Sequence, residues 1–116
     1  MNKKISVDSL KENIQVYMRL EKDNENGWGW LYSCALDDFL KSEDVTLAYV
    51  NQMTKDEFDV MISLSSDIVA KLKSVELANA FINIYKKYYG QGLEDNYLYQ
   101  NEIQPLFDFI QKNMSE

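Results

Sequence analysis

The sequence predicts an all-α protein, an irregular bundle of five to six helices in which helical hairpins stack around one core. Apolar residues recur at three- and four-residue steps over most of the chain, which is typical of helices with one buried face. Residues whose side-chain oxygens cap helix N-termini precede several of these stretches. With 116 residues, of which 46% are hydrophobic, the chain is long enough to form a single domain, 1–116, with a substantial core.

The stretch 54–90 shows both signals most clearly. Thr54 and Glu57 have the spacing of a capping box. An apolar stripe then continues to a break at residues 73–74, and a second stripe ends at Gly90, a residue that takes the left-handed conformation at a helix end without strain. Two helices joined by so short a link are expected to lie antiparallel. The two stripes consist of Phe58, Met61, Ile62, Ile68, Val69 and Leu72, and of Leu77, Phe81, Ile84, Tyr85 and Tyr88.

Two helices are predicted before this hairpin. The first is capped by Ser9, with Ser6 or Asp8 as earlier alternatives, and ends in the polar stretch 21–27. The second covers 28–40, where Asp37 and Asp38 fall opposite a wide apolar face. Trp28 and Trp30 are two positions apart and point in nearly opposite directions on a helix, so they cannot both enter one core. The apolar face of the second helix contains Leu31, Tyr32, Ala35, Leu36, Phe39 and Leu40.

The remaining elements are predicted from shorter signals. Ser42 starts a segment whose β-branched residues would suit a strand, but no pairing strand is evident, so a short helix to Met53 is favoured over a strand at 45–53. Residues 93–100 are expected to form a loop or a single turn. Asn101 is expected to cap the last helix, with Pro105 in its first turn. Stacked hairpins of the HEAT-repeat kind are a less favoured alternative architecture.

The composition narrows the classes of function. The chain has no histidine and one cysteine, Cys34, so it lacks the usual general base, the common nucleophile pairs and a Cys/His zinc site. We therefore expect no enzyme activity and no cofactor or metal. A single cysteine cannot form an internal disulfide, and no apolar segment follows the first lysines, so a cytoplasmic location is expected.

The net charge of −7 comes from 19 acidic and 12 basic residues, and it is concentrated towards both ends of the chain. Nucleic-acid-binding proteins usually show the opposite balance, and no segment is long and apolar enough to span a membrane. A negative surface attracts basic proteins, so a basic protein partner is expected rather than nucleic acid or a membrane.

Two groups of acidic and aromatic residues are candidate binding surfaces. Such mixtures are frequent at protein–protein interfaces, although acids beside aromatics can also be ordinary solvated surface. The first surface contains Trp28, Trp30, Tyr32, Asp37, Asp38, Glu43 and Asp44, and the second contains Glu94, Asp95, Tyr97, Tyr99 and Glu102.

Other clusters are better explained by structure than by chemistry. Asp56, Glu57 and Asp59 suggest a carboxylate metal or acid–base site, but acids in a first helical turn are favoured by the helix dipole alone. Ser65 and Ser66 with Lys71 suggest a nucleophile pair without any sign of an oxyanion hole. Cys34 is expected to be a small buried residue.

The overall profile resembles that of bacterial immunity proteins, of the contact-dependent growth inhibition or bacteriocin type. The residues that carry the resemblance are Trp28–Tyr32 with Asp37 and Asp38, and Glu94–Tyr99. The resemblance implies that the chain binds and neutralises a cognate toxin, such as a nuclease with a basic surface. Two alternatives stay open: an acidic inhibitor that mimics nucleic-acid charge, of the anti-restriction or anti-CRISPR type, and a carboxylate- and Mg²⁺-dependent enzyme.

Overall fold

The computed structural model describes residues 5–23, 27–90 and 99–114. Within these ranges the chain forms six helices and no strands, so the predicted all-α bundle is confirmed. Two of the helices contain a π-helical turn. The elements are α1 (Val7–Lys22), a continuous run of α2 (Gly27–Trp30), η1 (Leu31–Ala35) and α3 (Leu36–Phe39), then α4 (Glu43–Val50), α5 (Lys55–Leu72), α6 (Val75–Tyr89), and η2 (Tyr99–Ile103) leading into α7 (Gln104–Met114).

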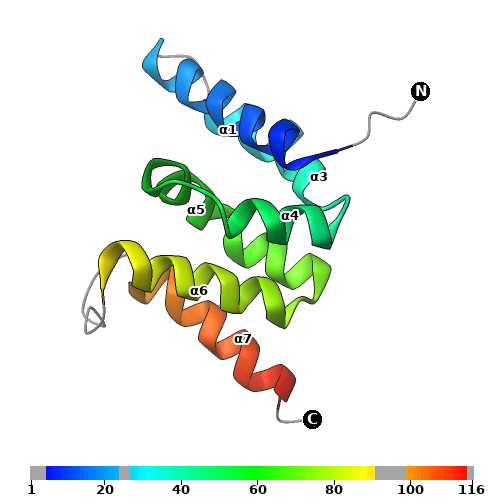
Figure 1. The fold of residues 1–116 in the computed structure, drawn as a ribbon, viewed down its shortest axis with the longest axis vertical. Coiled ribbons are helices and arrows are strands. Elements are labelled where there is room, and N and C mark those ends of the chain that lie inside the picture. The colour runs from blue at the N-terminus through cyan, green and yellow to red at the C-terminus, as the bar shows by residue number, and fades with distance from the viewer. Residues whose placement is uncertain (1–4, 24–26, 91–98, 115–116) are drawn as a thin grey trace.

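The helices are arranged around the hairpin of α5 and α6. In Figure 1, α1 and α7 lie at opposite ends of the long axis of the molecule, with α4, α5 and α6 between them. α1 contacts α2 and α4, whereas α7 contacts both α5 and α6. One cluster of buried apolar side chains connects these elements and includes Ile14, Leu31, Phe58, Phe81 and Leu106. Among the described helices, none has both the length and the apolar character needed to cross a membrane.

The predicted hairpin 54–90 is confirmed, although Gly90 ends α6 with φ 79° and ψ −168° and not in the left-handed helical conformation expected there. Thr54 caps α5 and forms the capping box with Glu57, and Ser74 caps α6. Lys73 ends α5 with a φ of 51°, a left-handed conformation that reverses the chain between the helices. The hydroxyl of Tyr88, near the end of α6, donates to the carbonyl of Met53 at 2.8 Å, just before α5. The end of α6 therefore lies beside the start of α5, and the two helices are antiparallel as expected.

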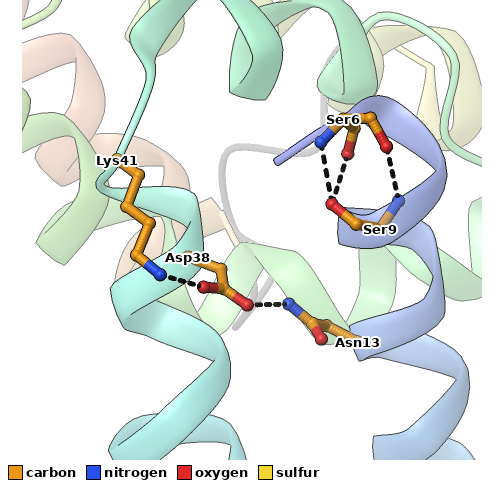
Figure 2. Close-up of polar contacts among 5 residues, drawn as sticks. All are labelled: Ser6, Ser9, Asn13, Asp38 and Lys41. Carbon is orange, nitrogen blue, oxygen red and sulfur yellow. Dashed lines mark hydrogen bonds and ion pairs between the residues drawn. The ribbon is translucent and has the colours of Figure 1, made fainter. Parts of the chain in front are cut away.

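The first helix starts earlier than the Ser9 box predicts. Ser6 is the N-cap, the earlier alternative, and Ser9 occupies the third helical position of the capping box. Ser9 N donates to Ser6 Oγ at 3.1 Å, and Ser6 N donates to Ser9 Oγ at 2.8 Å, as Figure 2 shows. The prediction at Ser9 is wrong because a serine can take the role that glutamate usually has in a capping box, and this moves the helix start by three residues.

The run 27–39 confirms the predicted second helix but contains a π-turn that the sequence pattern did not predict. The N–H of Leu36 donates to the carbonyl of Leu31, five residues earlier. Leu31, Ala35 and Phe39 are buried, yet Tyr32 is 44% exposed, so its assignment to the apolar face is wrong. The wider turn holds an extra residue, so positions spaced for an α-helical stripe no longer share one face.

The segment after Ser42 is helical rather than extended. Ser42 accepts a hydrogen bond from the N–H of Val45, and α4 ends at Val50, slightly before the predicted end at Met53. At the other end of the chain, the last helical run begins at Tyr99 rather than after a cap at Asn101. Pro105 consequently lies inside a helical run. The π-turn before it shifts the hydrogen-bonding register, which accommodates a residue without an N–H.

Candidate interaction surface

The first predicted surface is divided by the fold between two sides of the helix 27–39. Asp38 contacts Asn13 in α1, whereas Tyr32 contacts Ser63 in α5. Asp38 and Tyr32 therefore face different helices, although only six positions separate them in sequence. Asp38 and Tyr32 have different neighbours in the folded chain, and these neighbours decide what each side chain offers to a partner.

Asp38 holds α3 against α1. One carboxylate oxygen accepts a hydrogen bond from Asn13 Nδ2 at 3.0 Å, and the other accepts one from Lys41 Nζ at 2.8 Å, as Figure 2 shows. This contact raises the pKa of Lys41 above its usual value, first through the hydrogen bond and then through the charge of Asp38. A carboxylate whose charge is already paired has less to offer a partner, so we assign Asp38 a structural role.

The other residues of this surface differ in exposure. Asp37 and Asp44 are exposed, and Glu43 is half-buried in the first turn of α4. Trp30 is partly buried against the core, which leaves less of its indole accessible. The side chain of Trp28 lies outside the part of the molecule that the structure describes.

Most of the second predicted surface also lies outside the described residues. This applies to Glu94, Asp95 and Tyr97, and to the side chain of Tyr99. Glu102 in η2 is described and is half-buried. The negative charge of Glu102, from the second predicted surface, acts on Tyr32 of the first predicted surface.

Tyr32, Asp67 and Glu102 form an acidic and aromatic group, which we call the Tyr32 patch. Tyr32 comes from η1, Asp67 from α5 and Glu102 from η2. Tyr32 is the one large hydrophobic side chain that is exposed among those the structure describes, at 44%. Its hydroxyl donates to the carbonyl of Ser63 at 3.2 Å, which fixes the ring against α5.

The electrostatics of the Tyr32 patch show that its charges influence one another. Partial burial raises the pKa of Tyr32 above its usual value, and the negative charges of Asp67 and then Glu102 raise it further. Partial burial also raises the pKa of Glu102, with a smaller contribution from the charge of Asp67. In the described part of the chain, no lysine or arginine forms an ion pair with Asp67 or Glu102. The patch therefore carries negative charge that no lysine or arginine within residues 5–23, 27–90 and 99–114 neutralises through an ion pair.

The chemistry of the Tyr32 patch suits contact with a cation. Carboxylates accept charge-assisted hydrogen bonds from Lys or Arg, and an exposed tyrosine ring offers its face to the same groups. The chain matches no protein-family model, no curated protein and no solved structure. The candidate surface is accordingly defined by its own geometry and charge.

Asp67 is not among the binding residues that the sequence predicts. It is the one acid between Asp59 and Glu76, and it follows Ser63 by four residues on α5. This spacing places the two residues on the same face of the helix and predicts that this face is exposed. Periodicity alone does not show that η1 and η2 lie over that face, so the sequence offered no signal for the patch itself.

The other predicted clusters have structural explanations. Glu57 is buried, and its carboxylate accepts hydrogen bonds from Tyr49 and from the N–H of Thr54. Asp59 accepts a hydrogen bond from Tyr89 and pairs with Lys55. Within residues 5–23, 27–90 and 99–114, no three acidic, histidine or cysteine side chains are grouped closely enough to hold a metal ion. Ser65 is buried and donates to the carbonyl of Ile62, and the side chain of Cys34 lies outside the described residues.

Proposed function

We propose that this chain is an immunity protein that binds a cognate toxin protein and blocks its activity. The toxin would be a bacterial protein with a basic surface, most simply a nuclease. The observation that carries the proposal is the Tyr32 patch, where an exposed tyrosine, hydrogen-bonded to the carbonyl of Ser63, lies near two carboxylates that lack a cationic partner among the described residues. The net charge of −7 supports it from the whole sequence.

The mechanism would be occlusion of the toxin. A nuclease must hold phosphate groups with Lys and Arg side chains, so its active cleft carries positive charge. Opposite charge on this chain would accelerate association, because long-range attraction orients the two proteins before contact. A tyrosine ring that is already held against α5 would lose little side-chain freedom on binding. The burial of this ring away from water would stabilise the complex and slow its dissociation. Action in the cytoplasm, where a single cysteine remains reduced, is part of this proposal.

A co-expression experiment tests the function directly. The gene next to the one for this chain is examined for a large secreted protein, and its C-terminal domain is expressed alone and together with this chain. We expect the domain to be toxic alone and harmless in the presence of this chain, and the two purified proteins to form a complex. The matched control replaces this chain with another acidic helical protein of similar size and charge.

Two outcomes would contradict the proposal. One is that the neighbouring genes encode no toxic domain. The other is that a toxic domain is encoded there but remains equally toxic with this chain and with the control protein. Complex formation should also weaken as the salt concentration rises, since association between exposed opposite charges is screened.

A further inference from the structure

An open apolar groove lies between α5 and α7, which we call the α5–α7 groove. It has a volume of about 270 Å³ and is formed by one side of each helix. On α5 the exposed Ala70 contributes, and on α7 the half-buried Phe109 contributes. A groove of this kind can accept one or two apolar side chains of a partner. Its lining consists of Ser66, Val69, Ala70, Pro105, Leu106, Asp108, Phe109 and Lys112.

The groove is continuous with the Tyr32 patch along α5. Ser63, Asp67 and Ala70 are separated by four and three residues, so they follow one another on the same face of the helix. Tyr32 covers the start of this face through its bond to the carbonyl of Ser63. Asp67 lies next to Ser66 in sequence, and Ser66 already lines the groove. A bound segment could therefore touch the patch and the groove together.

The charges along this surface are ordered. Glu102 and Asp67 lie at the end where η2 leads into α7, and Lys112 lines the groove near the other end of α7. Lys112 follows Glu102 by ten positions along the helical run, a length of about 15 Å. Asp108, between them, accepts a hydrogen bond from Gln104 Nε2 at 3.1 Å, so it is held within α7 by a neutral partner. The surface thus has two carboxylates at one end, a largely apolar groove that Asp108 also lines, and a lysine at the other end.

We propose that the Tyr32 patch and the α5–α7 groove form one docking surface for a segment of the toxin. The segment presents a Lys or Arg side chain to Asp67 and Glu102, over the ring of Tyr32, and places a neighbouring apolar side chain in the groove. The inference rests on the proposed function for the identity of the partner, and it specifies the face used and the chemistry of what binds there. Charge complementarity selects this occupant, because an acidic or neutral segment would leave both carboxylates without a partner.

Nuclear magnetic resonance of the whole chain tests the surface with a defined probe, the peptide acetyl-Leu-Arg-Leu-amide. We expect saturable shifts confined to the backbone amides of residues 66–70 and 102–109. The comparison peptide acetyl-Leu-Gln-Leu-amide has the same apolar side chains without the charge. It should bind about fivefold more weakly or worse, since charge-assisted hydrogen bonds are roughly twice as strong as neutral ones.

Two pairs of variants provide matched controls. The double variant Asp67→Asn with Glu102→Gln should weaken peptide binding about fivefold or more, because both acceptors lose their charge. The double variant Asp37→Asn with Asp44→Asn removes the same charge from the first predicted surface and should change binding less than about twofold. Ala70→Tyr should block the groove, whereas Asn79→Tyr adds the same side chain at an exposed position of α6 and should leave binding unchanged.

Several results would overturn the docking surface. These are shifts spread over all acidic regions, shifts centred on α3 and α4, no saturable shift, or equal weakening by both double variants. Shifts of the groove residues that depend on protein concentration without peptide would show that a second copy occupies the groove, and would also overturn it.

The toxin assay separates the two proposals. If a toxin is neutralised equally well by the wild type and by the variant carrying Asp67→Asn and Glu102→Gln, this docking surface is wrong and the immunity function stands. If the peptide results hold but no neighbouring toxin is neutralised, the surface stands as a basic-segment site and the immunity function is wrong.

Discussion

The phenol of Tyr49 donates a hydrogen bond of 2.9 Å to Oε2 of Glu57 inside the core, where Glu57 is 2% exposed. The other oxygen of the same carboxylate accepts from the N–H of Thr54 at 2.9 Å and completes the capping box. One side chain therefore connects α4 to the first turn of α5. A buried carboxylate of this kind is stable only while its hydrogen-bond donors remain in place.

Replacing Tyr49 by Phe should destabilise the protein by about 1–3 kcal/mol, because Glu57 Oε2 loses its donor at a position that water does not reach. Urea unfolding followed by circular dichroism measures the change. Tyr32→Phe is the matched control, since it removes the same hydroxyl from an exposed ring, and it should cost less than about 1 kcal/mol. Equal losses for the two variants would mean that the Tyr49–Glu57 bond contributes nothing special to stability.

Stability should fall in alkaline solution because Tyr49 and Tyr17 have a higher pKa in the folded state than in the unfolded state. Burial raises the pKa of Tyr49, and the hydrogen bond and charge of Glu57 raise it further. Burial also raises the pKa of Tyr17 to about 12, assisted by Glu21. Below the unfolded pKa of about 10 the phenols are protonated in both states, so their contribution to the free energy of unfolding has its full value. As the pH rises above that value the unfolded state loses protons first, and stability decreases.

Urea midpoints measured between about pH 9 and about pH 12 test this dependence. The double variant Tyr17→Phe with Tyr49→Phe should be less stable at the lower pH but should lose less stability as the pH rises. Because both proteins share the same lysines, deprotonation of those lysines affects them alike. A variant with the wild-type slope would show that these two phenols do not cause the alkaline loss.

Asp38→Ala should cost about 1 kcal/mol, since it removes the acceptor for Asn13 and the partner of Lys41. Asp37→Ala, at the neighbouring exposed position, should change stability by no more than about 0.5 kcal/mol. Urea unfolding of the two variants, together with Asn13→Ala and the double variant, gives the coupling between Asn13 and Asp38. Additive effects of Asn13→Ala and Asp38→Ala would contradict the bridge between α1 and α3.

Glu102→Gln should stabilise the isolated protein at neutral pH while weakening its binding to a basic partner. The folded pKa of Glu102 is raised, first by burial and then by Asp67, so ionisation at neutral pH acts against folding. The gain should stay below about 1 kcal/mol because solvent screens a half-exposed carboxylate. It should disappear below the unfolded pKa of about 4.5, where Glu102 is protonated in both states.

Thermal or urea unfolding at neutral and at acidic pH measures this difference. Glu43→Gln is a control at another half-buried glutamate, and we expect no such gain there because Glu43 lies in the first turn of α4, where the helix dipole favours a negative charge. A Glu102→Gln variant that is less stable than the wild type at neutral pH would show that the carboxylate is stabilising, and would contradict this account of the patch.

The helix boundaries were predictable where the signal is local. A hydroxyl at Ser42, Thr54 or Ser74 caps an amide three residues along the chain, so the contact depends only on neighbours in sequence. The π-turns were not predictable in this way. They depend on how a helix fits against others, and they changed the exposure of Tyr32 and the place of Pro105.

The all-α class, the hairpin 54–90 and the negative charge were therefore predictable from the sequence, because apolar periodicity, capping and composition are properties of short segments or of the whole chain. The packing of the helices was needed to show that Glu57 bonds Tyr49 in the core, that Asp38 faces α1, and that Asp67 and Glu102 lie near Tyr32. These contacts join residues from different helices. They arise from the packing of the entire core, in which each helix settles against all of its neighbours at once.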